Sequence, residues 1–292
     1  MSGYLDKVFG ELMQDELQLD VYLVVGLTIL FVFGAVGCSL AGVTKESQVK
    51  KRAWIITTFS AGFCFLVSIY ACNEAPINWD FRLRAVLMGE TSLSRFIVHF
   101  FRAQAVLDLV LGVIFYRGEL NFLTSIVHHT AYFLLCNWML AHSCSLMFII
   151  CCLEELPTML LGVGHINKKW RQDMPFGITY GILRVALHSF LCFTVMTYPV
   201  PDDRLGVIRF NFGLTWFLHT HWFWGWVQQQ RRIKSGSDKP TGSGSPMTHP
   251  ESPSTRRSPS FEMLNISGSV GSRSSSRSST SSKAKVGLDK IM

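Results

Sequence analysis

Two adjacent histidines, His128 and His129, stand inside an apolar stretch of the chain. A histidine at neutral pH can take a proton as a general base, or can carry an acyl group as a nucleophile. Ionisable side chains inside a membrane-spanning segment cost free energy and usually mark a site. The pair therefore indicates a candidate catalytic site.

Other ionisable residues occupy the neighbouring apolar stretches at a similar depth. At about 1.5 Å of rise per residue, they lie roughly 9 to 15 Å from one set of helix ends. Such alignment across several helices predicts a shared intramembrane chamber or a buried ion-pair network. The residues of this layer are Asp108, His128, His129, Glu154, Glu155, Arg184 and His219.

Helical spacing predicts which faces point into the chamber. Residues three and four positions apart share one face of a helix. The three stripes expected to face inward are His128, Tyr132, Leu135, Met139 and His142; Tyr180, Arg184 and His188; and Asn211, Thr215, His219 and Trp222. Pro157 should interrupt the backbone hydrogen bonds near Glu154, which a lined cavity tolerates better than lipid does.

A simpler interpretation applies to several of these residues. A single buried histidine is usually a hydrogen-bonded packing residue, which is the expectation for His99, His142 and His188. Arg184, opposite Glu154 or Glu155 and Asp108, could form a structural ion pair rather than act in function. Both interpretations of Arg184 remain open at this point.

The composition predicts the elements that position these residues. The 292 residues are 49% hydrophobic and 16% charged, with a mean hydropathy of +0.28, which is too apolar for an ordinary soluble domain. A membrane-spanning helix needs about 20 largely apolar residues. We therefore predict an all-α, polytopic transmembrane helix bundle with about seven spans. These are Val21 to Val43, Ala53 to Cys72, Phe96 to Tyr116, Phe122 to His142, Ser143 to Gly164, Phe176 to Val200 and Leu205 to Val227.

Charge divides the chain into regions and predicts its orientation. Lysine and arginine collect in every second loop and after the last span, which places the acidic N-terminal segment 1–20 in the lumen and the C-terminus in the cytosol. The first span and its loop occupy 21–49 and the remaining spans occupy 50–234. Residues 235–292 are rich in Ser, Arg, Gly and Pro, and we expect a disordered cytosolic tail.

Several other chemistries find no support in the sequence. Six of the eight cysteines lie inside the predicted spans, away from the lumenal ends, as small apolar fillers, and they form no metal-ligand spacing, so we expect no resident metal. Cys72 and Cys144 are both expected near the lumenal face, where they could form a disulfide. The net charge of +7 belongs partly to loops and tail and predicts no nucleic-acid binding. There is also no Gly-rich phosphate cradle.

The order of these motifs resembles that of the TLC-domain family of multispanning membrane proteins. The resemblance covers roughly residues 50–234. It rests on Leu107-Asp108-Leu109, Val127-His128-His129-Thr130, Glu154-Glu155-Leu156-Pro157-Thr158, Arg184 and Thr215-Trp216-Phe217. It implies a helix bundle around a central cavity, usually in the endoplasmic reticulum. In ceramide synthases the matching histidine pair serves N-acyl transfer from acyl-CoA. The aspartate pair of those enzymes has no counterpart in any span here, because Asp202-Asp203 lies in a predicted lumenal loop.

Two functional hypotheses follow. In the first, His128 or His129 catalyses acyl transfer to a sphingoid base or lysolipid, with acyl-CoA as co-substrate and no permanently bound cofactor. In the second, the same chamber binds a membrane lipid without chemistry and acts in lipid homeostasis through membrane protein partners or a homo-oligomer. The broader expectation is a TLC-like integral membrane protein of lipid homeostasis, with Asp108, Tyr132, Glu154, Glu155, Arg184 and His219 supporting its chamber.

Overall fold

The computed structural model describes residues 16–40, 45–74, 89–198 and 203–235, and these ranges contain helices and no strand. The predicted acidic segment up to residue 15 and the predicted tail from residue 236 lie outside the described residues. The prediction of an all-α fold is confirmed for the part of the chain that is described.

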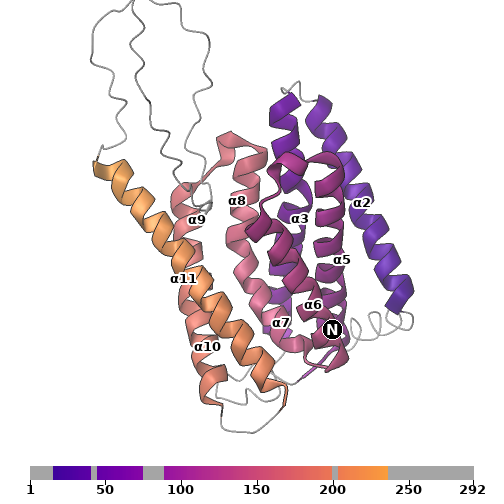
Figure 1. The fold of residues 1–292 in the computed structure, drawn as a ribbon, viewed down its shortest axis with the longest axis vertical. Coiled ribbons are helices and arrows are strands. Elements are labelled where there is room, and N and C mark those ends of the chain that lie inside the picture. Colours follow the sequence, from indigo (N-terminus) through magenta and orange to yellow (C-terminus); the bar gives the residue numbers. More distant parts are fainter. Residues whose placement is uncertain (1–15, 41–44, 75–88, 199–202, 236–292) are drawn as a thin grey trace, which may run out of the picture. The chain divides into compact units, whose positions relative to one another are not determined.

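The described helices run as roughly antiparallel segments (Figure 1). Three of the segments contain short irregular helices, labelled η, in line with their α-helices. The first three helices of the described residues are α2 (Glu16–Leu40), α3 (Lys45–Glu74) and α5 (Ser92–Phe115), and η1 (Arg117–Glu119) follows them. The next segments are η2 (Phe122–Val127) with α6 (His128–Ala141), and α7 (Ser145–Cys151) with η3 (Cys152–Glu155) and α8 (Leu156–Ile166). After η4 (Lys168–Trp170) come α9 (Asp173–Thr179), η5 (Tyr180–Leu187) and α10 (His188–Thr197), and then α11 (Leu205–Ser235).

Five of the described helical segments are long and apolar enough to cross a membrane: Glu16–Ser39, Ser47–Cys72, Ser92–Phe115, Ser145–Ile166 and Asp173–Thr197. Each coincides with a predicted span. The two other predicted spans, in η2–α6 and in α11, are helical but are not among these five. They are less apolar because they carry polar residues such as His128, His129 and Arg209 along their length.

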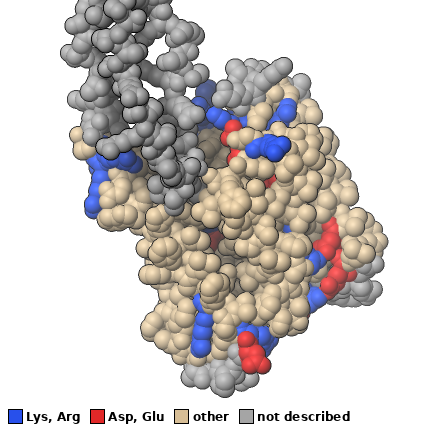
Figure 2. All heavy atoms as spheres, viewed as in Figure 1, with Lys and Arg blue, Asp and Glu red and all other residues tan. Residues whose placement is uncertain are grey.

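The outer surface is apolar where a membrane would surround it. Large hydrophobic side chains are exposed along α2, α5 and α10, for example Phe33 at 73%, Ile114 at 64% and Phe193 at 65%. The visible face in Figure 2 is largely uncharged, with charged groups near its two ends and along one side. Soluble monomers rarely expose so much apolar surface, so hydrocarbon is the solvent that these helices fit.

α3 occupies a central place in the bundle, in contact with α2, α5, α7 and α8. Its approach to α8 depends on Gly162, where an added Cβ would lie 2.0 Å from Thr58 Oγ1. Small residues allow helix backbones to pack closely without a bulky side chain between them. This close contact fixes α8, and with it the acidic residues that precede α8, against the centre of the bundle.

The polar side chains at the start of α2 hold that helix against α5. Asp20 accepts a hydrogen bond from Arg102 and lies 2.9 Å, through Oδ1, from Nδ1 of the fully buried His99. Glu16 pairs in the same way with Arg95. These ion pairs explain how Arg102 is accommodated within a predicted span, because its charge is compensated by a carboxylate from the neighbouring helix.

The cysteines form no disulfide among the described residues. Cys72 and Cys144 are therefore not joined to each other, although their predicted positions allowed that pairing.

Candidate functional site

A cavity inside the bundle is lined by side chains from seven of the helical elements. It leaves about 60 Å³ for the centres of water-sized molecules, and roughly 10 to 15 Å³ suffices for one water. Its polar lining residues are Tyr132, Glu154, Glu155, Arg184, His188, Asn211, Thr215 and His219. The apolar part of its lining includes Phe101, Leu135, Met139, Met147, Phe148 and Ile208.

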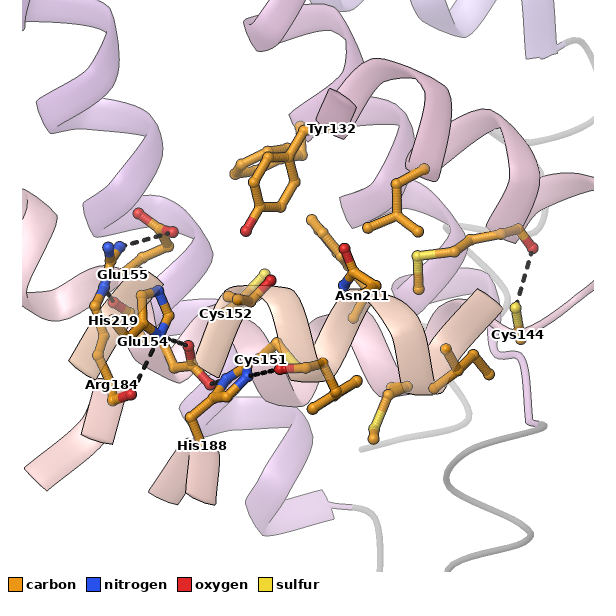
Figure 3. Close-up of a pocket in the computed structure, with 18 of the residues that line it drawn as sticks. Tyr132, Cys144, Cys151, Cys152, Glu154, Glu155, Arg184, His188, Asn211 and His219 are labelled. Carbon is orange, nitrogen blue, oxygen red and sulfur yellow. Dashed lines mark hydrogen bonds and ion pairs between the residues drawn. The ribbon is translucent and has the colours of Figure 1, made fainter. Parts of the chain in front are cut away.

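The two kinds of residue separate along the cavity. In Figure 3 the labelled charged side chains and histidines lie together at one end, and Cys144 lies at the other. Tyr132 and Asn211 lie between these ends and point toward the interior. The cavity is therefore amphipathic, with a charged end and a largely apolar remainder.

Arg184 organises the charged end. Its Nε donates to the carbonyl oxygen of Glu154 at 2.8 Å, and its Nη2 donates to Thr158 Oγ1 at 2.6 Å and to Glu155 Oε1 at 3.3 Å. The guanidinium carbon also lies 5.5 Å from the ring centre of Tyr180, which is a cation–π distance. The guanidinium thus compensates the carboxylate of Glu155 but contacts only the backbone of Glu154.

The Glu154 carboxylate instead faces two histidines. His188 Nδ1 lies 2.7 Å from Oε1 and His219 Nδ1 lies 3.5 Å from Oε2. All three side chains are buried, with residue exposures of 5% for Glu154, 3% for His188 and 4% for His219. The second ring nitrogen of His188 lies 3.2 Å from the carbonyl oxygen of Phe212, and His219 Nδ1 lies 3.1 Å from that of Arg184.

Those contacts limit the protonation states. Both neighbours of His188 are acceptors, so a neutral ring can donate to only one of them, from Nε2 to the Phe212 carbonyl oxygen or from Nδ1 to the Glu154 carboxylate. In the tautomer that donates from Nε2, Nδ1 has a lone pair directed at a carboxylate oxygen 2.7 Å away. Such a contact is favourable only when a proton or another cation lies between the two atoms.

Glu154, Glu155 and Arg184 are positioned by turns of 3-10 and π-helix rather than by regular α-helix. Glu154 and Glu155 lie on the 3-10 helix η3, immediately before α8, where Pro157 is in the first turn. The predicted interruption near Glu154 is confirmed, and Arg184 uses the carbonyl oxygen of Glu154 at that interruption. Arg184 itself belongs to the π-helix η5, and π-helical turns occur often at functional sites.

The predicted stripes reach the cavity in part. Asn211, Thr215 and His219 of α11 line it, as do Tyr132, Leu135 and Met139 of α6 and Arg184 and His188. His142 is exposed at the end of α6, with Nδ1 2.8 Å from the carbonyl oxygen of Trp138. The spacing of residues on regular helices was therefore sufficient to orient most of the lining.

Asp108 and the adjacent histidines form a separate group beside the cavity. His129 Nε2 lies 3.3 Å from Asp108 Oδ2, and Tyr116 donates its hydroxyl hydrogen to Asp108 Oδ1 at 2.6 Å. His128 packs against Tyr132, with ring centres 4.7 Å apart. Neither histidine of the predicted catalytic pair lines the cavity, whereas Tyr132 does and connects the two groups.

The sequence pattern did not predict the contact of His188 with Glu154, because His188 was expected to be a packing residue. Its spacing from Arg184 was visible, but its distance to Glu154 depends on how η3 and η5 are placed. Cys151 and Cys152 were expected to be apolar fillers, and both line the cavity near the acidic pair.

The fold and this site define the class as an α-helical protein with membrane-spanning helices and a buried amphipathic cavity. No protein-family model matches the chain, and no curated protein matches it either.

Proposed function

We propose that the chain is a TLC-like integral membrane protein of lipid homeostasis whose cavity binds one membrane lipid. The lipid headgroup contacts the end formed by Arg184, Glu155 and the Glu154–His188–His219 group, and an acyl chain extends toward Met147 and Ile208. In this proposal the bundle crosses the endoplasmic reticulum membrane seven times and its C-terminus is cytosolic.

The amphipathic lining is the observation that carries the proposal. A cavity with charge at one end and aliphatic or aromatic side chains along the rest matches a molecule that is itself polar at one end. Arg184 and the two carboxylates can form hydrogen bonds with an amine, hydroxyl or phosphate group. A water-soluble metabolite would leave the apolar part of the cavity unused.

The packing of η2–α6 and α11 against the other helices supports the proposal of seven crossings. Contacts between α5 and α6 and between α10 and α11 align these less apolar helices with neighbours that are long and apolar enough to cross. Four of their polar residues, Tyr132, Asn211, Thr215 and His219, line the cavity, which lowers the cost of placing these residues in the membrane.

Acyl transfer is the second candidate function, and the contact between His188 and Glu154 favours it. A carboxylate that orients a histidine is a frequent arrangement in general acid–base and nucleophilic catalysis. Both ring nitrogens of His188 have partners, whereas among the described residues no hydrogen bond reaches His219 Nε2. His219 is therefore the ring that would exchange a proton with an amine or hydroxyl during transfer from acyl-CoA.

Lipid analysis of cells that lack the endogenous chain tests both candidates. Cells are complemented with wild type, with His219→Gln, and with His128→Gln/His129→Gln, at matched protein levels. If the cavity binds lipid, wild type restores the lipid profile and the His219 variant does not. An unchanged profile on removal and return of the wild-type chain contradicts the proposal.

A second assay separates binding from chemistry. Purified protein in lipid nanodiscs is incubated with acyl-CoA and either a sphingoid base or a lysolipid. Acyl-CoA consumption that disappears in His219→Gln supports acyl transfer. Lipid retention without consumption of either acceptor supports the binding function alone.

A further inference from the structure

The group of Glu154, His188 and His219 has the composition of a metal site. One ligand atom from each residue lies within 4.8 Å of the corresponding atoms of the other two. The residues come from three different segments, η3, the start of α10 and the middle of α11. Two imidazoles and a carboxylate are a ligand set found in catalytic zinc sites, where a fourth position stays open.

The geometry at this end of the cavity provides a place for a cation beside Glu154. With neutral imidazoles, two ionised glutamates carry two negative charges, and Arg184 carries one positive charge that it directs to the Glu155 carboxylate and to the backbone of Glu154. The Glu154 carboxylate is buried with only imidazoles beside it. A buried carboxylate without a compensating positive charge is strongly unfavourable.

Surrounding contacts orient His188 as a ligand. Metal-binding histidines usually donate their other ring N–H to a carbonyl or carboxylate oxygen. The Phe212 carbonyl occupies this position at His188 Nε2, which leaves Nδ1 as the ligand atom on the side of Glu154. Phe212 also stacks on the imidazole, with ring centres 5.0 Å apart, and limits rotation of the ring.

We propose that Glu154, His188 and His219 bind one divalent transition-metal ion, with zinc as the expected metal. Nitrogen ligands favour zinc over magnesium or calcium, which prefer oxygen. All three residues line the cavity, so the remaining coordination position would face its interior. The expectation of no resident metal, which rested on the spacing of cysteines in the sequence, is thereby replaced.

The open position gives the ion a role at the headgroup. It would bind a carbonyl or phosphate oxygen of the ligand and withdraw electron density from it. This role rests on the proposed lipid function, whereas the metal site itself does not.

Metal content of the purified full-length chain tests the inference. The protein is expressed in zinc-supplemented medium, purified in detergent without chelator and analysed by inductively coupled plasma mass spectrometry. We expect about one zinc ion per chain for wild type, and at least a fivefold loss for Glu154→Gln and for His188→Ala/His219→Ala. His142→Ala removes an exposed histidine outside the group and should retain the wild-type content.

Adding zinc back to wild-type protein that was treated with a chelator provides a readout that does not depend on whether the variants fold. Zinc should raise the unfolding temperature in a saturable way, because an ion that binds only the folded state stabilises it. Cobalt should produce visible absorption bands, and zinc should abolish them.

Three results would overturn the proposal. The first is wild-type protein that remains metal-free after zinc is returned, with no change in unfolding temperature, which would mean that a proton neutralises Glu154. The second is zinc that persists in both folded variants. The third is zinc loss in His142→Ala equal to that in the double variant. Lipid retention is measured separately, so failure of the metal site and failure of the lipid function are distinguishable.

Discussion

At the scale of single residues, Arg184 determines how the charged end of the cavity is held together. Its three hydrogen bonds join η3, α8 and η5. Among the residues that line the cavity, Arg184 is the one arginine. Removal of one partner from a buried ion pair is much more costly than replacement of both, because the remaining charge loses its compensation.

The substitution Arg184→Gln should therefore destabilise the fold by roughly 3 to 5 kcal/mol. The measurement is the unfolding of purified protein in detergent, followed by temperature or denaturant. Arg117→Gln alters an exposed arginine in η1 and should change stability by less than about 0.5 kcal/mol. Equal effects of the two substitutions would contradict the assigned role of Arg184.

The contact between Asp108 and His129 provides a second residue-scale prediction. Asp108 is buried between Tyr116 and His129, so loss of the Tyr116 hydroxyl removes a hydrogen bond to a carboxylate. Tyr116→Phe should cost roughly 1.5 to 3 kcal/mol. A double-mutant cycle of Asp108→Asn with His129→Gln should give a non-zero coupling energy, and strict additivity would show that the pair does not interact.

At the scale of helices, the close contact between α3 and α8 positions the acidic pair. The substitution Gly162→Ala places a Cβ against Thr58 and should destabilise the bundle by about 1 to 3 kcal/mol. Gly26→Ala in α2 is the matched control, because nothing lies within 4 Å of the added Cβ. The control should be neutral or slightly stabilising, since alanine favours helix more than glycine does. A neutral Gly162→Ala would refute the close contact.

The comparison of sequence and structure is clearest at this scale. Apolar stretches of about 20 residues were enough to locate the helices, because hydrophobic length is a local property of the chain. Residue spacing then oriented Tyr132, Arg184, Asn211 and His219 correctly. The irregular turns η3 and η5 were less accessible, since π-helices depend on neighbouring helices as much as on local sequence. The proline at 157 was the one local signal for η3.

That difference explains which site residues the sequence could and could not assign. His128 and His129 are conspicuous as adjacent letters, yet they are the first two residues of α6, about one turn before Tyr132, and the cavity does not extend to them. Tyr132, on the same face as His128, lines the cavity. His188 is close to Glu154 because two segments 34 positions apart meet, and no periodicity within one helix contains that information.

At the scale of the whole molecule, the prediction concerns the number of crossings. If η2–α6 crosses the membrane, then η1 and the turn at His142 lie on opposite sides. Gly118→Cys should react with a membrane-impermeant thiol reagent from the cytosolic side of sealed microsomes. His142→Cys should react only after the membrane is opened. Both positions are exposed, and labelling of the two from the same side would exclude the seven-span arrangement.

The central claim is that the amphipathic cavity holds a lipid, and the bound lipid can be measured directly. Wild-type protein is purified in mild detergent, and its copurified lipids are compared by native mass spectrometry with those of Ile208→Trp, which fills the apolar part of the cavity. Phe193→Trp changes an exposed residue of α10 and is the matched control. We predict a defined lipid on wild type and on Phe193→Trp and its loss from Ile208→Trp. A lipid complement that is the same in all three proteins would contradict the claim.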